Sequence, residues 1–183
     1  PRDNQAVTPH PDGAARLARF RTSVLFQRLP DAYLCPHGDH GRSGGSAGRE
    51  VRPASQPRHG VTRRLDVRIR ARDGLELSAN IWLPDDVDAG ARHPAILEMI
   101  PYRKDDWRAN ADEARGRYLA RRGYVLCRVD VRGTGRSDGL ALDEYTADET
   151  RDGYDAVEWL AGPPWCTGEV GMWGISYGGF TAI

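Results

Sequence analysis

The pentapeptide Gly-Ile-Ser-Tyr-Gly at residues 174–178 constrains the fold of this chain more than any other feature. It follows a short apolar run at 170–173 and precedes a stretch that favours a helix. A strand that runs into Gly-x-Ser-x-Gly turns so sharply that the serine backbone is strained and its hydroxyl stands above the sheet. Because the chain contains 21 glycines, the pentapeptide alone is weak evidence. Its position after an apolar strand predicts a nucleophile elbow, with Ser176 as the nucleophile.

The segments before the pentapeptide show clear strand patterns. Alternating apolar residues on both sides of Arg-Asp-Gly at 72–74 predict a β-hairpin with an Asp-Gly turn. Nearly continuous apolar runs at 94–100 and 124–129 are typical of strands that are buried on both faces of a sheet. The sequence therefore predicts a hairpin followed by two interior strands.

Two helices are predicted between these strands and the pentapeptide. The first, over 112–123, begins with acidic residues and ends with arginines and a glycine. Thr146 and Glu149 form a capping-box pattern before the second, which stops at Gly162. Strands that alternate with helices after an antiparallel start predict the α/β class. The expected sheet is mostly parallel and doubly wound, with an antiparallel N-terminal hairpin.

Composition argues against several classes of protein. The 26 basic and 26 acidic residues balance, so no net charge favours a nucleic acid or a membrane surface as a partner. Three widely spaced cysteines indicate neither a disulfide framework nor a zinc site, and Cys127 is expected to be a small buried apolar residue. No apolar run reaches the roughly 18 residues of a membrane span, and no signal-peptide pattern is present. We expect a cytoplasmic protein and leave its oligomeric state open.

Residues 1–60 differ from the rest in being rich in Arg, Pro, Gly and Ser. Such a composition buries too little apolar surface to offset the entropy of ordering, so we expect mostly disorder, with a short helix at 14–27. Ligand types for a metal crowd into one loop without a second cluster, which argues against a metal site there: Cys35, His37, Asp39 and His40. An Arg-rich tail that touches nucleic acid is another weak alternative. A leader, a linker or a mistranslated stretch fits the composition better.

Seven motifs occur in one order along residues 61–183. They are Arg-Asp-Gly (72–74), Pro-Tyr-Arg-Lys (101–104), Gly-Tyr-Val (123–125), Asp-Val-Arg-Gly-Thr-Gly-Arg-Ser (130–137), the acidic and aromatic run 152–160, Pro-Trp (164–165) and the segment 168–179. Together they make this part of the chain resemble the cocaine esterase / Xaa-Pro dipeptidyl-peptidase (CocE/NonD) family of α/β-hydrolases. The expected domains are thus a disordered segment at 1–60 and the N-terminal portion of an α/β-hydrolase domain at 61–183, truncated after the elbow.

The resemblance implies an activity and an oxyanion hole. Members of this family cleave esters, amides or Xaa-Pro peptides through an acyl-enzyme on a serine, here Ser176, without a cofactor. They stabilise the oxyanion with a tyrosine hydroxyl on the loop after the third strand and with the N–H that follows the nucleophile, which here are Tyr102 and the backbone of Tyr177. The alternative for Tyr102 is ordinary aromatic packing at a strand end. The expected substrate is a small ester, an amide or a short peptide.

The order of the triad raises a second expectation. In α/β-hydrolases the acid and the histidine follow the serine along the chain. All five histidines precede Ser176 here: His10, His37, His40, His59 and His93. We therefore expect the catalytic Asp and His to lie outside this chain, which would be an N-terminal fragment that is inactive by itself. The alternative is a non-catalytic remnant or a binding module.

Other motif residues are expected to be structural. Asp130 and Arg132 should lock their loop by hydrogen bonds, and the only lysine, Lys104, should hold the loop that carries Tyr102. The glycine pair at 133 and 135 lacks the Gly-Lys-Ser/Thr of a phosphate loop. The tryptophans of the later motifs are expected to pack in the core or between a helix and the sheet: Trp159, Trp165 and Trp173.

Overall fold

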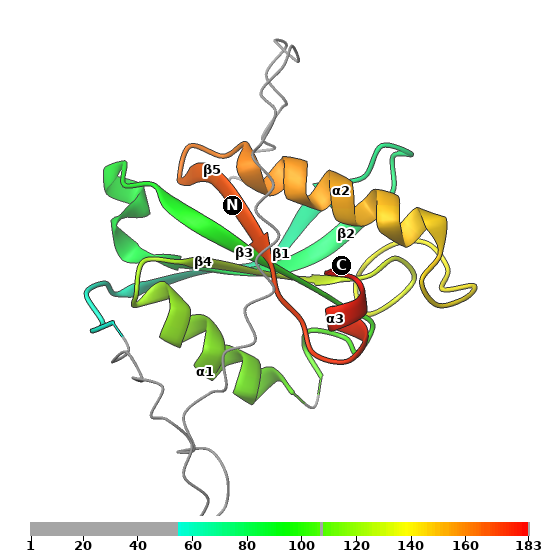
Figure 1. Ribbon diagram of the computed structural model, residues 1–183, viewed down its shortest axis with the longest axis horizontal. Helices are drawn as coiled ribbons and strands as arrows, with labels where there is room; N and C mark the ends of the chain where they lie inside the picture. Colours follow the sequence, from blue (N-terminus) through cyan, green and yellow to red (C-terminus); the bar gives the residue numbers. More distant parts are fainter. Residues whose placement is uncertain (1–54, 107, 183) are drawn as a thin grey trace, which may run out of the picture.

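The computed structural model describes residues 55–106 and 108–182 (Figure 1). Three predictions fall on residues outside these ranges: most of the disordered segment, the helix at 14–27 and the candidate metal ligands at 35–40. The described elements, in chain order, are β1 (Val61–Arg70), β2 (Glu76–Pro84), the 3-10 helix η2 (Asp85–Ala89), β3 (His93–Ile100), α1 (Ala109–Ala120), β4 (Val125–Asp130), α2 (Ala147–Ala161), β5 (Cys166–Met172) and α3 (Tyr177–Phe180).

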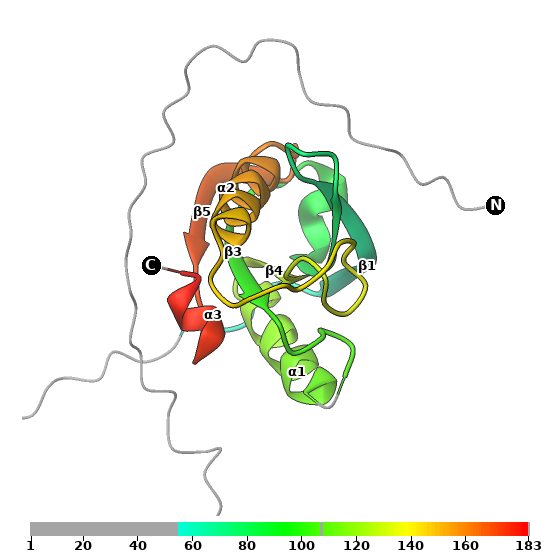
Figure 2. The ribbon, with the colours of Figure 1, turned by 90° about the vertical axis from the view of Figure 1, so that its right-hand side faces the viewer.

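The five strands form one sheet in the order β1-β2-β4-β3-β5. β1 pairs antiparallel with β2, and β2 antiparallel with β4, whereas β3 lies parallel to both β4 and β5. Figures 1 and 2 show α1 on one face of this sheet and α2 on the other. The predicted α/β class is confirmed, as a mixed sheet with a parallel centre and an antiparallel N-terminal pair.

The hairpin prediction is also confirmed. β1 and β2 are joined by a tight turn in which the Ala71 N–H donates to Leu75 O at 2.8 Å and the Gly74 N–H donates to Ala71 O at 2.9 Å. A bulge interrupts the pairing between Arg64 and Val67, where Asp66 takes a positive φ of 53°. The bulge has a function in the fold, because the Asp66 carboxylate there accepts a hydrogen bond from Lys104.

Two apolar clusters hold the layers together. The larger lies between the sheet and α2 and includes Leu97, Val129 and Leu160, and the smaller lies under α1 around Trp82 and Leu126. Because β3 and β4 contribute to both clusters, their sequences are apolar on both faces, as predicted. Cys127 is completely buried, and burial raises the pKa of its thiol, so it behaves as the predicted small apolar residue.

The interior strands also contain buried charged residues within their mostly apolar sequences. Glu98 on β3 and Arg128 on β4 are nearly inaccessible and form an ion pair at 3.1 Å. Asp112 and Arg115 of α1 complete this group, since Asp112 contacts Arg128 and Arg115 contacts Glu98 at 2.9 Å. The charges therefore attach α1 to the sheet, beside the small apolar cluster.

One expectation needs correction. Thr146 caps α2 by accepting from the Glu149 N–H at 3.2 Å, but Glu149 does not reach back to Thr146, because its carboxylate accepts the Tyr177 hydroxyl at 2.7 Å. Trp159 and Trp165 pack in the larger cluster as predicted. Trp173, which directly follows β5, lies outside both clusters, and its ring lies 5.5 Å from the guanidinium of Arg115 on α1. Across 55–106 and 108–182, no helix is long and apolar enough to cross a membrane.

Candidate active site

Ser176 occupies the sharp turn between β5 and α3. Its backbone has φ 58° and ψ −124°, a conformation that residues other than glycine rarely adopt. The side chain is exposed at the start of α3. The Trp173 N–H donates to Leu97 O at 3.0 Å, which fixes the last step of β5 beside β3 just before the turn. The local geometry is the strained strand-to-helix turn that the Gly-x-Ser-x-Gly pattern predicts.

The two glycines of the pentapeptide are required by close backbone approach. A Cβ at Gly174 would overlap the carbonyl group of Gly178. A Cβ at Gly178 would lie 3.0 Å from the carbonyl oxygen of Met99 on β3. Both contacts involve backbone, which cannot move aside as the end of a flexible side chain can. Any larger residue at Gly174 would therefore open the turn that presents Ser176.

Tyr102 and Tyr177 meet beside Ser176 although 75 residues separate them in the chain. Tyr102 lies on the loop that follows β3, and Tyr177 begins α3 after β5. Because β3 and β5 are parallel neighbours, their carboxyl ends reach the same edge of the sheet. The Tyr177 N–H points at the Tyr102 hydroxyl oxygen, with 3.3 Å between the two atoms. The three site residues predicted from the sequence thus lie together.

These residues line one cavity of about 440 Å³. The residues lining it are Pro101, Tyr102, Val131, Thr134, Ala141, Leu142, Asp143, Glu144, Tyr145, Glu149, Ser176 and Tyr177. Three carboxylates among them, Asp143, Glu144 and Glu149, give the wall an acidic character. Sequence reasoning missed these lining residues; Glu149 was assigned only to a helix cap, and no local pattern indicated that the loop before α2 faces Ser176.

The Tyr177 hydroxyl forms hydrogen bonds within the cavity wall. It donates to the Glu149 carboxylate at 2.7 Å and accepts from the Tyr145 N–H at 3.2 Å, and the Tyr145 ring stacks on the Tyr177 ring at 4.4 Å. Burial, together with the bond to Glu149, raises the pKa of Tyr177 to about 12. The phenol therefore stays protonated at neutral pH. Only the backbone N–H of Tyr177 is directed toward Tyr102.

Lys104 holds the loop that carries Tyr102, as predicted. Its ammonium group is completely buried and lies 2.9 Å from Asp66, 2.9 Å from Asp105 and 3.5 Å from Asp130. Its backbone N–H donates to Asp130 at 2.6 Å. Burial alone would lower the pKa of Lys104, but the bonds to Asp66 and Asp105 outweigh it and raise that pKa. Lys104 is therefore a fixed cation that binds this loop to β1 and to the end of β4.

The loop after β4 is locked in the way that the sequence predicts. Asp130 also accepts from the Arg136 N–H at 3.1 Å. Arg132 donates to Asp152 of α2 at 2.6 Å and to Asp73 of the hairpin turn at 3.0 Å. The bond to Asp152 is the main reason that the pKa of Arg132 lies above its usual value. This loop thereby joins the hairpin turn to α2 and supports one wall of the cavity.

No described residue supplies a base to Ser176. Within 55–106 and 108–182, no side chain forms a hydrogen bond with its hydroxyl, and the histidines in those ranges, His59 and His93, both contact Asp86. His93 opens β3, at the opposite end of the strand from Tyr102. The described residues therefore contain a strained serine with two nearby donors, and no serine–histidine pair.

Comparison with known proteins agrees with the family resemblance seen in the sequence. The sequence profile of the X-Pro dipeptidyl-peptidase (S15) family matches residues 73–183. A relative from Mycobacterium bovis, provisionally named a serine esterase, is 33% identical over 144 residues, which cover 70% of this chain and 23% of that protein. Cocaine esterase of a Rhodococcus species is 32% identical over 117 residues, which cover 63% of this chain and 20% of that enzyme. The chain therefore spans about a quarter or less of the length of these relatives.

Solved structures agree on the fold. A CocE/NonD family hydrolase from Staphylococcus aureus superposes with a TM-score of 0.57 at 21% identity, covering 73% of this chain and 30% of its own. At this level of identity the likeness concerns the fold alone. It places the mixed sheet described above among α/β-hydrolases.

Proposed function

The chain belongs to the X-Pro dipeptidyl-peptidase (S15) family of CocE/NonD serine hydrolases, and on this premise we propose that it carries the nucleophile and the oxyanion hole of an enzyme that cleaves ester or amide bonds, Xaa-Pro peptide bonds among them. The observation that carries the proposal is the meeting of three groups at one edge of the sheet. These are the strained Ser176, the Tyr102 hydroxyl and the Tyr177 N–H.

The proposed reaction proceeds through an acyl-enzyme. Ser176 Oγ attacks the substrate carbonyl while a histidine takes its proton, and an aspartate orients that histidine; both residues are proposed to come from chain beyond Ile183. The tetrahedral intermediate collapses when the histidine gives the proton to the leaving alcohol or amine. Water then attacks the acyl-enzyme and releases the acid. No step needs a metal or an organic cofactor.

The two donors have a distinct role in these steps. The carbonyl oxygen gains negative charge as Ser176 attacks, and donors already oriented toward it stabilise that charge without reorganising. In the free protein the Tyr177 N–H donates to Tyr102 Oη. An oxyanion between them would accept from both groups, since the phenol O–H can rotate toward it. The fixed Lys104 loop supports this role, because it restricts the position of the phenol.

The substitution Tyr102→Phe in the full-length protein tests this proposal. Loss of the hydroxyl should lower kcat by about 10²–10³-fold with little change in KM, provided that KM reflects substrate binding. The melting temperature should stay close to that of the wild type, because the phenyl ring keeps its packing. Tyr124→Phe is a matched control, since Tyr124 is 41% exposed against 37% for Tyr102 and lies before the amino end of β4. A Tyr102→Phe enzyme with most of its kcat would remove Tyr102 from the oxyanion hole.

A second candidate function is a non-catalytic binding module built on this fold. The specific observation in its favour is that no described histidine lies near Ser176. An active-site-directed fluorophosphonate separates the two candidates, because it reacts rapidly only with a serine that a base activates. Labelling of the full-length protein that Ser176→Ala abolishes supports the enzyme. Absence of labelling in a folded full-length protein supports the binding module.

A further inference from the structure

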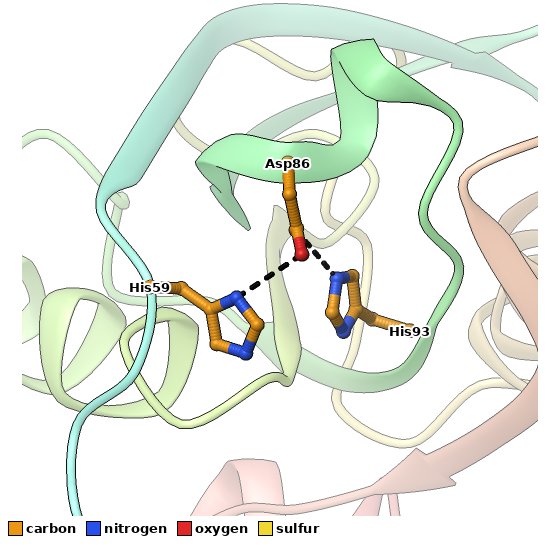
Figure 3. Close-up of side chains that lie close together, drawn as sticks. All are labelled: His59, Asp86 and His93. Atoms are coloured by element: carbon orange, nitrogen blue, oxygen red, sulfur yellow. Dashed lines mark hydrogen bonds and ion pairs between the residues drawn. The ribbon is translucent and has the colours of Figure 1, made fainter.

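Three side chains from separate segments meet where β3 begins (Figure 3). His59 lies before β1, Asp86 lies on η2, and His93 is the first residue of β3. The Asp86 carboxylate stands between the two imidazoles, with Oδ2 at 3.2 Å from His59 Nδ1 and Oδ1 at 2.8 Å from His93 Nε2. The two rings lie edge to face, with their centroids 5.1 Å apart. None of these residues takes part in the reaction proposed for Ser176.

We propose that His59, Asp86 and His93 form a binding site for a divalent transition-metal ion such as Zn²⁺. One potential ligand atom from each residue lies within 4.8 Å of the others. Ligand atoms held at about 2.0–2.2 Å from one zinc ion are themselves about 3–3.5 Å apart, so small side-chain rotations would bring these three onto an ion. Two imidazoles and one carboxylate suit zinc and its neighbours in the transition series better than calcium or magnesium.

The three side chains already face one another. Metal ligands must be deprotonated, so a bound ion would replace the contacts that His59 Nδ1 and His93 Nε2 now make with the Asp86 carboxylate.

The backbone around the three ligands is already fixed. The His93 N–H donates to Trp165 O at 2.9 Å, and the His59 N–H donates to Arg121 O at 3.2 Å. The Gly60 N–H, next to His59, donates to the Asp85 carboxylate at 2.8 Å, and this bond ties the segment before β1 to η2. Preorganised positions reduce the entropy lost when an ion binds.

Exposure increases from the inner ligand to the outer one. The His93 side chain is 10% exposed, that of His59 is 23% exposed and that of Asp86 is 38% exposed. An ion can therefore enter from the Asp86 side and keep water as a further ligand.

The proposed site is far from Ser176 and its neighbours. His93 and Tyr102 lie at opposite ends of β3, about 25–30 Å apart at roughly 3.3 Å per residue. The proposed ion is accordingly structural, and it cross-links the segment before β1 to η2 and β3.

Zinc titration of the full-length, chelator-stripped protein tests the proposal. Isothermal titration should show one zinc site that needs all three residues. His93→Gln or Asp86→Asn should weaken zinc binding by about 100-fold or more. This loss of affinity exceeds the loss of about 10–100-fold that is typical when a residue merely supports a ligand. At a Zn²⁺ concentration 100-fold above Kd, the folding equilibrium should shift about 100-fold toward the folded state, which raises the wild-type melting temperature. Hydrolysis should be unchanged after chelation at a temperature where the protein stays folded.

The control variant addresses competing ligands in the part of the chain before residue 55. A combined Cys35→Ser, His37→Gln and His40→Gln variant should keep the zinc site. Loss of zinc binding in that variant, with binding retained in His93→Gln, would assign the ion to the other cluster and overturn the proposal. So would a folded wild type that binds no zinc, in which case the three side chains form only a hydrogen-bonded bridge. If His93→Gln does not fold, the more exposed His59→Gln replaces it in the comparison.

Discussion

Replacing Lys104 with methionine is expected to destabilise the protein by about 2–3 kcal/mol, since it removes the cation at the centre of three carboxylates. Losing one partner of a fully buried ion pair costs about 3–5 kcal/mol, and an exposed pair contributes about 0–1 kcal/mol. Asp66 and Asp105 are more than a third exposed and regain water, whereas Asp130 is 1% exposed. Asp130 keeps two backbone N–H donors, so the cost falls below the fully buried limit.

The pH dependence identifies the source of this stability. The pKa of Lys104 is raised from its ordinary value of 10.5, so its contribution is complete below that pH and is lost as pH rises through the higher folded value. Burial raises the pKa of Asp66, but Lys104 and Arg136 outweigh it and lower that pKa from 3.8. That contribution is present above pH 3.8 and is lost as pH falls through the lower folded value. The difference between wild type and Lys104→Met should therefore be largest between these limits.

Urea denaturation across pH measures this difference, and Lys104→Arg is the matched control because it keeps the charge. We also expect Lys104→Met to lower kcat at a temperature where the protein is folded, by up to about 10²-fold, because a loosened loop misplaces Tyr102. A loss of stability below about 1 kcal/mol, or one that does not vary with pH, would refute the reasoning that the ion pairs hold this loop.

Three further outcomes are expected. Arg128→Leu leaves Glu98 and Asp112 buried with only Arg115 as a counter-charge, so urea denaturation should show a loss of about 3 kcal/mol; a neutral effect would mean that the buried charges are dispensable. Gly174→Ala should abolish fluorophosphonate labelling of full-length protein that remains folded by circular dichroism, because the new Cβ overlaps the Gly178 carbonyl; normal labelling would contradict this steric argument. The 183-residue chain alone should show no nitrophenyl ester turnover that depends on Ser176, since no described histidine lies near it; a burst abolished by Ser176→Ala would reveal a base.

Patterns among residues close together in the sequence predicted much of the fold of this chain. The hairpin follows from alternating residues around Arg-Asp-Gly, and β3 and β4 follow from their apolar runs. The turn at Ser176 follows from the Gly-x-Ser-x-Gly pattern, because the close approach of Gly174 to Gly178 occurs within five residues. Each of these features depends on neighbours in the chain. The pairing of Tyr102 with Tyr177 was expected only from the family resemblance.

Contacts between distant segments were decided by the assembled sheet. The order β1-β2-β4-β3-β5 sets which strand ends share an edge, and no local periodicity encodes that order. The strand order brings the Glu149 carboxylate, which the sequence assigns to a helix cap, against the Tyr177 hydroxyl. It also pairs Glu98 with Arg128 inside runs that are otherwise apolar. It also gathers His59, Asp86 and His93. Sequence analysis considered the two histidines only as lying too early in the chain for a triad. A side chain's partner depends on which backbones pack beside it, and only the tertiary structure determines that.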